Sequence, residues 1–144
     1  MVESLVKKNM ITLPKVAEVM KSVNRGEFCD FPECAYYDCP QSIGFNATIS
    51  APFMHALVLQ VLSSKLTPGA KALDIGCGSG YLCPAMLAMM DFDGKVVGIE
   101  HIPELASKCI KNIEKSYMNE LREEKICIYQ KDGREGFEAE GPFD

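Results

Sequence analysis

Three acidic residues stand at the ends of short apolar segments, a pattern suited to binding a nucleotide-like ligand. Asp74 lies in ALDI, Glu100 ends KVVGIE, and Asp132 follows ICIYQ. A carboxylate at the second position can accept hydrogen bonds from both ribose hydroxyls. One at the third position can meet an adenine amino group, while Gly133 lets the base lie flat. Each acid alone could instead be a helix cap or a solvated loop residue, so their joint placement carries the prediction.

A glycine loop follows the first of these acids, and its spacing helps to decide which class of ligand is bound. In DIGCGSGYL the glycines are Gly76, Gly78 and Gly80, and the next residue is Tyr81. A dinucleotide fingerprint needs G-x-G-x-x-G, which disfavours an NAD-linked oxidoreductase, and no phosphate-loop G-K-[ST] occurs. The G-x-G-x-G form behind an acid resembles motif I of S-adenosylmethionine-dependent methyltransferases. There Asp74 would lie near the amino-acid part of the ligand, and the glycine backbone allows close approach.

A strip without acids, lysines or arginines precedes this loop. It spans residues 41–55 and reads QSIGFNATISAPFMH. Ser50 before Ala51-Pro52 predicts an N-cap, opening a helix over residues 51–62 that is apolar nearly all round and should be buried. His55 in its first turn is either a core histidine or a functional one, and the sequence leaves both readings open.

The elements that must position these residues alternate between strand and helix. Strands are predicted over 72–75, 95–100 and 126–130, with helices over 81–90 and 102–117 between them. Such alternation indicates parallel strands and right-handed crossovers, hence a Rossmann-like α/β sheet with the three acids at its carboxyl edge. An N-terminal extension of helices, near 5–10 and over 14–22, leads into an irregular segment over 24–45.

Length and composition indicate how many domains the chain forms. The 144 residues, 47% of them hydrophobic, predict a single domain: N-terminal helices and a substrate loop over 1–66, and the first βαβαβ half of a sheet over 67–144. Three strands make a small sheet with an open edge, so we expect further C-terminal strands to be missing from this chain.

Charge and cysteine usage bear on partners and location. With 20 acids, 15 bases and no basic patch, we expect no nucleic-acid or membrane partner. Without a leader or an apolar span, we expect a cytoplasmic protein, monomeric if complete. The seven cysteines are predicted to be free thiols. Cys29, Cys34 and Cys39 are spaced by five, which does not suit structural zinc, so no metal is predicted.

Taken together, four segments resemble the protein-L-isoaspartate O-methyltransferase family, which repairs damaged aspartyl sites. They are SIGFNATISAP, ALDIGCGSGYL, VVGIEHIPELA and KDGREGF. The resemblance implies methyl transfer from S-adenosylmethionine to the α-carboxylate of isoaspartyl residues in peptides and proteins, with S-adenosylhomocysteine as product. The implied positions lie in the uncharged strip and at the strand ends. Those in the strip are the active-site residues Ala47, Thr48, Ile49 and Ser50, with Ser50 catalytic, and His55, which contacts the cofactor. The remaining cofactor positions are Asp74, Gly76, Gly78, Glu100, Asp132 and Gly133.

Two departures and two alternatives accompany this resemblance. Cys77 and Cys83 are unusual thiols around the glycine loop and raise the expectation of oxidation sensitivity. Family members continue past residue 144, so the chain could be a non-catalytic fragment or binding remnant of such an enzyme. A methyltransferase acting on another substrate is the other alternative, although it has no reason to keep the T-I-S strip.

Overall fold

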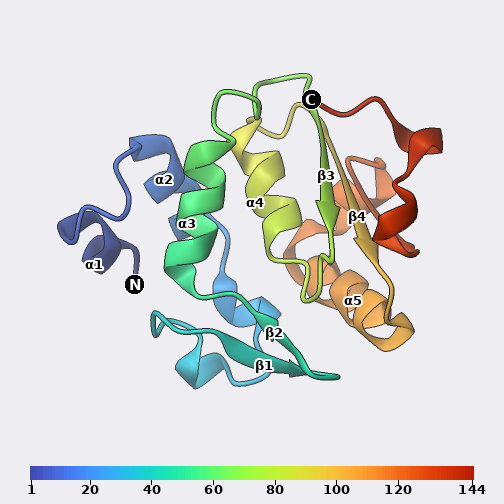
Figure 1. Cartoon of the computed structure of the whole chain (residues 1–144). Coiled ribbons are helices and arrows are strands. Elements are labelled where there is room, and N and C mark those ends of the chain that lie inside the picture. Colours follow the sequence, from blue (N-terminus) through green and yellow to red (C-terminus); the bar gives the residue numbers. More distant parts are fainter.

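The computed structural model describes residues 1–144 and is built around a three-stranded parallel sheet (Figure 1). Its order is β3-β4-β5, with strands Lys71–Ile75, Lys95–Glu100 and Ile126–Gln130. The central strand is buried from Val96 to Glu100, because helices and neighbouring strands leave it no contact with water. The predicted Rossmann-like α/β fold is confirmed, and the bounds of β4 and β5 are as predicted.

The register brings the functional strand ends to one edge. Ile75 pairs with Ile99, which in turn pairs with Tyr129. Because parallel strands share their direction, the glycine loop after β3, Glu100 and the segment after β5 all leave from this edge. The last residue of the chain, Asp144, donates its backbone N–H to the Lys71 carbonyl at 3.0 Å, beside the start of β3.

Two helices connect the strands and carry the core. Helix α4 (Leu82–Met89) is buried from Cys83 to Met89, and α5 (Pro103–Arg122) packs on β4 and β5. The 20-residue α5 runs past its predicted end at residue 117, with one non-helical residue at Tyr117. A single cluster of 31 buried apolar residues extends from Val2 to Ile126. No helix combines the length and apolar character that crossing a membrane requires.

The helix of the uncharged strip contributes to this core with one side only. Helix α3 (Pro52–Val61) packs on α2 (Pro14–Ser22) and α4 through His55, Ala56 and Leu59 (Figure 1). Its other side is open to solvent, with Val61 68% exposed. The prediction that α3 is buried all round was therefore wrong: α4 takes the central position between the sheet and the N-terminal helices, and α3 is left as an outer layer.

The N-terminal segment differs from prediction in two places. Helix α1 spans Val2–Lys7 rather than 5–10, and Asn9 with φ 58° follows its end. Strands β1 (Gln41–Gly44) and β2 (Ala47–Ile49) form an antiparallel hairpin inside the uncharged strip. Its two loop residues, Phe45 and Asn46, both have positive φ, as in a type I′ turn. Phenylalanine is rarely found in that conformation, so no local pattern predicted the hairpin.

The remaining segments are short 3₁₀ helices. Two precede the hairpin and two follow β5: Arg25–Phe28, Pro32–Cys34, Gly133–Glu135 and Glu138–Glu140.

Candidate active site

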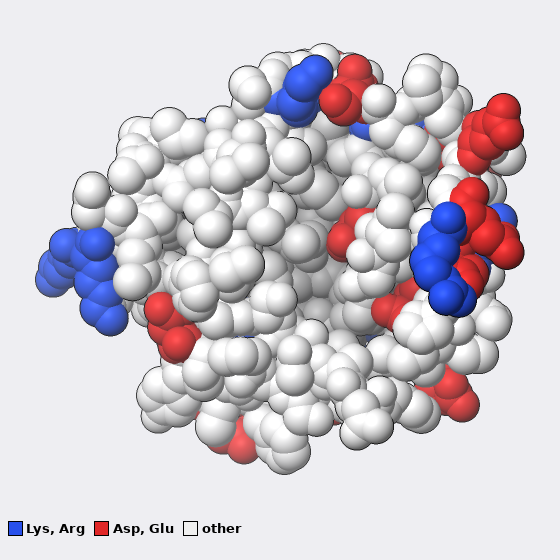
Figure 2. Space-filling model, viewed as in Figure 1, with Lys and Arg blue, Asp and Glu red and all other residues white.

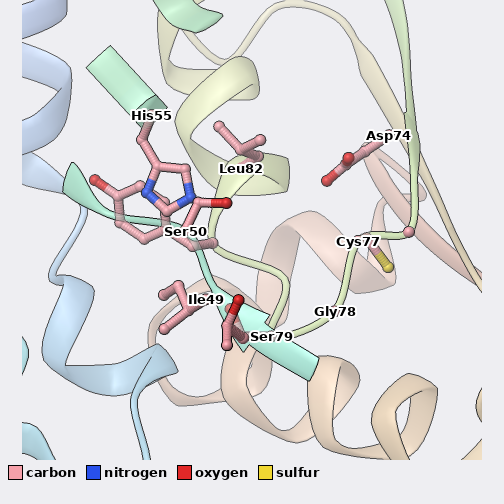
Figure 3. Close-up of a pocket in the computed structure, with 11 residues that line it drawn as sticks. Ile49, Ser50, His55, Asp74, Cys77, Gly78, Ser79 and Leu82 are labelled. Carbon is pink, nitrogen blue, oxygen red and sulfur yellow. The ribbon is translucent and has the colours of Figure 1, made fainter. Parts of the chain in front are cut away.

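A cavity of about 70 Å³ opens where the hairpin meets the glycine loop (Figure 3). Eleven residues line it, from the end of β2, the first turn of α3, the end of β3 and the loop into α4: Thr48, Ile49, Ser50, His55, Asp74, Gly76, Cys77, Gly78, Ser79, Tyr81 and Leu82. Seven of these are predicted site residues. Ala47, on β2, is the one predicted strip residue that does not line the cavity. Figure 2 shows that this face carries few charged side chains and that acidic atoms lie inside its hollow.

Ser50 is exposed at the mouth of this cavity and does not cap α3. The N-cap is Ala51, and the first-turn N–H of Phe53 donates to Asp38 Oδ1 at 2.9 Å. Asp38, from the preceding irregular segment, thus satisfies the donor that an N-cap serine would take. The N-cap prediction was wrong for this reason, and the Ser50 hydroxyl is left available to a ligand.

Behind Ser50, His55 is held by a buried arginine. Arg25 is 1% exposed and donates from Nε to the Ala35 carbonyl at 2.8 Å. Its Nη1 lies 3.1 Å from His55 Nδ1, and because guanidinium only donates, Nδ1 accepts and the ring proton sits on Nε2. Burial and the Arg25 charge lower the pKa of His55 to about 3. The imidazole is therefore neutral at pH 7 and offers one N–H donor.

The same histidine stacks on Tyr81, the N-cap residue of α4. The ring centroids are 4.5 Å apart with an interplanar angle of 29°. The Tyr81 hydroxyl and Arg25 Nη2 are buried without a hydrogen-bond partner. Two unpaired buried polar groups beside a cavity are unusual, because each carries a desolvation penalty that a native fold normally avoids. His55 thus connects the uncharged strip to the glycine loop.

Asp74 faces the cavity from β3 (Figure 3). The Cys83 thiol, 3.8 Å from Oδ2, is its hydrogen-bond donor within the chain. Burial, together with the nearby Cys77 and Glu100, raises the pKa of Asp74 to about 7. A carboxyl with so weak a partner is poised to ionise when a cationic group comes close.

Glu100 braces the glycine loop from the end of β4. Its Oε2 accepts from the Gly78 N–H and its Oε1 from the Ile102 N–H, both at 3.0 Å. His101 Nδ1 lies 3.2 Å from Oε1. The side chain is buried, and each carboxylate oxygen can accept more than one hydrogen bond. Glu100 thereby fixes the loop and keeps capacity for a ligand hydroxyl.

Asp132 and Gly133 lie in an adjoining cavity of about 420 Å³ rather than in the first one. Gly76 lines both, so the two cavities meet at the first glycine of the loop. Arg134 donates to both oxygens of Asp132, at 3.0 Å to Oδ1, and lowers the pKa of that carboxyl to about 2. A ligand amino group would share Asp132 with Arg134 or displace it.

Replacing Gly80 by alanine is expected to lower the free energy of unfolding by ~3 kcal/mol or more. Gly80 has φ +90°, and a Cβ there would lie 2.6 Å from Cys109 Sγ and 3.2 Å from Ile113 Cδ1. Gly69→Ala is the matched control, because Gly69 has φ +83° and nothing within 4 Å of its Cβ position. It should cost ~1–2 kcal/mol. Urea denaturation measures both; equal losses would refute packing strain at Gly80.

Comparison with known proteins decides the family. The family described as Protein-L-isoaspartate(D-aspartate) O-methyltransferase (PCMT) matches residues 1–144. The chain belongs to this family. Protein-L-isoaspartate O-methyltransferase 2 of Arabidopsis thaliana is 46% identical over 145 residues, which cover 100% of this chain and 47% of the relative. The Caenorhabditis elegans enzyme is 43% identical over 143 residues, covering 99% of this chain and 63% of the relative. The chain thus spans roughly half to two thirds of these isoaspartate methyltransferases.

A solved structure of the family has the same fold. The Plasmodium falciparum protein-L-isoaspartate O-methyltransferase, crystallised with S-adenosyl-L-homocysteine, matches with a TM-score of 0.91 and 34% identity. The match covers 99% of this chain and 68% of that one.

Several residues of this site were not predicted from the sequence. Arg25, Asp38 and Tyr81 hold the predicted residues in place, and Ser79 and Leu82 line the cavity. The one sequence signal for Tyr81 is its position directly after the last glycine of the loop. Arg25 and Asp38 lie in an irregular segment without periodicity, so no sequence signal placed them beside α3.

Proposed function

We propose that this protein transfers a methyl group from S-adenosylmethionine to the α-carboxylate of L-isoaspartyl residues in damaged proteins. The chain forms one methyltransferase domain, in which residues 1–66 supply the substrate side and residues 67–144 the cofactor side. The observation that carries this proposal is the single cavity in which Thr48, Ile49 and Ser50 of the uncharged strip face Asp74 and the glycine loop. A methyltransferase acting on a small ligand alone would not need that strip.

The residues of the two cavities fit S-adenosylmethionine. Gly76 has φ +79° and only open space at its Cβ position, as a backbone approached closely by a ligand requires. Asp74 can pair with the ammonium group. Glu100 lines neither cavity, but it holds the Gly78 N–H of the loop and can accept from the ribose. Asp132 and Gly133 border the adjoining cavity, where the adenine would lie; a Cβ at Gly133 would fall 2.1 Å from Ile75 Cγ2. When bound, the sulfonium supplies an electrophilic methyl group.

On the acceptor side, the chain needs to orient an anion rather than remove a proton. A peptide α-carboxylate is ionised at pH 7, so no general base is required. The Ser50 hydroxyl is a neutral donor for this anion. The His55 Nε2–H, which the family resemblance assigns to the cofactor, is a second neutral donor, and Figure 3 shows the His55 ring beside Ser50. Neutral donors hold the carboxylate without the strong pairing that would reduce its nucleophilicity. The apolar side chains of Ile49 and Leu82 limit water at the reacting atoms.

Transfer of a tritiated methyl group to an isoaspartyl peptide, compared with its normal aspartyl twin, tests the proposal. We expect label only with the isoaspartyl peptide. A rise in melting temperature with S-adenosylhomocysteine but not with NAD tests the cofactor side separately. Stabilisation by S-adenosylhomocysteine with no label transferred would leave a cofactor-binding protein and overturn the enzymatic proposal.

Ser50→Ala is expected to reduce this methyl transfer by about 10- to 100-fold, because a hydrogen bond to a charged carboxylate contributes ~1.5–3 kcal/mol. The matched control is Ser42→Ala on the neighbouring strand of the hairpin, because Ser42 pairs with Thr48 but does not line the cavity. Its rate should match that of the wild type. Unchanged turnover in the Ser50 variant would remove Ser50 from the mechanism.

A further inference from the structure

Three buried thiols gather beneath the glycine loop. Cys77 belongs to the loop, Cys83 to α4 and Cys109 to α5, and all three are free and buried. The proposed methyl transfer uses none of them.

The sulfur atoms of Cys77 and Cys109 lie 3.8 Å apart. Two glycines make room for the cluster. A Cβ at Gly98 would lie 3.1 Å from Cys77 Sγ and 3.2 Å from Cys83 Sγ, and one at Gly80 would lie 2.6 Å from Cys109 Sγ. The sulfurs thus pack on bare backbone, with no side chain inserted between Cys77 and Cys109.

The three sulfurs differ in access and in protonation. Cys77 lines the cavity, opposite His55 and Ser50 in Figure 3, whereas Cys83 and Cys109 do not line it. Hydrogen bonds from Cys109 and Cys83 lower the pKa of the Cys77 thiol. The Cys77 sulfur and burial raise the pKa of both other thiols. A small oxidant entering the cavity would thus meet one thiolate backed by protonated thiols.

We propose that Cys77 and Cys109 form a reversible disulfide on exposure to a peroxide, and that this bond controls the cofactor loop. The Cys77 thiolate attacks one oxygen of hydrogen peroxide, the O–O bond breaks, and Cys77 sulfenic acid and hydroxide result. The Cys109 sulfur then attacks the sulfenic sulfur; the S–S bond forms and the S–O bond breaks. The hydroxide released takes the Cys109 proton, and the first hydroxide takes the proton that the Cys77 thiol gave up when it ionised. Two thiols and one peroxide thus give one disulfide and two waters.

The consequence for the loop follows from the geometry. An S–S bond of about 2.05 Å requires the two sulfurs to approach by roughly 1.8 Å. Cys109 is in the interior of the 20-residue helix α5, whereas Cys77 is in a short loop held by the Ile99 carbonyl and by Glu100. The loop is the softer element and should shift toward α5. This part rests on the proposed function, because it takes the loop as the cofactor's seat.

Peptide mapping of peroxide-treated protein tests the bond without reference to activity. Trypsin leaves Cys77 and Cys83 together in residues 72–95 and Cys109 in residues 109–111, so the predicted disulfide joins these two peptides. Chymotryptic cleavage after Tyr81 then assigns the link to Cys77 or Cys83. We expect Cys77 linked to Cys109, lost on treatment with dithiothreitol. A Cys77–Cys83 link, or sulfinic acid at Cys77 without any link, would overturn the assignment.

Affinity for S-adenosylhomocysteine tests control of the loop. Peroxide should weaken binding by about tenfold, a size typical of coupling between sites, and dithiothreitol should restore it. Cys109→Ser should bind as the reduced wild type does and resist peroxide, while the matched control Cys29→Ser, buried elsewhere, should stay sensitive. A mapped disulfide without any change in affinity would refute control of the loop. No affinity in the reduced protein would instead count against the proposed function.

Discussion

Replacing Arg25 by methionine is expected to reduce methyl transfer to an isoaspartyl peptide by about 100-fold while changing the free energy of unfolding by less than ~2 kcal/mol. The variant leaves the Ala35 carbonyl and His55 Nδ1 without their donors, each worth ~1–3 kcal/mol. Against this, it removes a buried cation whose hydrogen bonds go to a carbonyl and an imidazole rather than to a carboxylate. These two effects on the free energy of unfolding largely offset each other. In the site, however, nothing replaces the donor that orients His55.

The loss of activity should arise from His55 losing its orientation. Without Arg25 its Nδ1 can carry the proton, and Nε2 then no longer donates. Arg25→Lys is the matched control: it retains the charge but cannot bridge Ala35 and His55 as the planar guanidinium does, so it should also lose most activity. Full activity in either variant, or a stability loss large enough to explain the lost activity, would contradict this role.

¹⁵N NMR of the His55 ring reports its tautomer and its protonation, which a loss of stability alone would not change. The chain has two histidines, and His101 is exposed and serves as an internal reference. Since the pKa of His55 falls to about 3 from 6.5, the unfolded state takes up a proton between these pH values that the folded state refuses. The contribution of His55 to stability is thus fully present above about pH 6.5 and declines toward pH 3. Arg25→Met should raise the His55 pKa and alter its Nδ1 signal.

Affinity for S-adenosylhomocysteine is expected to rise by about 100-fold between pH 5 and pH 8, because only ionised Asp74 can pair with the ligand's ammonium group. With the Asp74 pKa raised to about 7, most of these carboxyls are protonated at pH 5 and most are ionised at pH 8. Binding at acidic pH must first remove that proton. Isothermal titration calorimetry at four pH values measures how this affinity changes with pH.

Asp74→Asn is the control for this dependence. It preserves shape and the contact with Cys83 but has no proton to lose, so its affinity should be weak and nearly independent of pH. A wild-type affinity that does not vary over this range would show that Asp74 does not meet the ammonium group. A pH dependence that survives in Asp74→Asn would assign the titration to another residue.

The cofactor side was largely predictable from the sequence, because local patterns determine it. Apolar runs marked the strands, and parallel pairing necessarily brought Asp74, Glu100 and Asp132 to one edge. What the pattern did not show is what those acids bond within the chain. Glu100 accepts from the loop backbone and Asp132 from Arg134, contacts that depend on the exact course of the loops.

The substrate side was less predictable, because contacts between distant segments decide it. Phe45 adopts a turn conformation that its side chain disfavours, so the hairpin gave no local signal. Ser50 had the sequence signature of an N-cap, but Asp38 from the preceding segment accepts the Phe53 N–H that such a serine would bind. The apolar faces of α3 and α4 look alike in sequence, and only packing order decides that α4 is enclosed and α3 is not.

The contact between Asp38 and the Phe53 N–H has one more consequence. Together with the Arg25–His55 contact, it fastens the irregular segment to the first turn of α3 at two points. The Phe53 amide can exchange its hydrogen with solvent only when its hydrogen bond to Asp38 breaks. Deuterium uptake at this single amide therefore reports how often the segment detaches, and a peptide bound at Ser50 would slow that uptake.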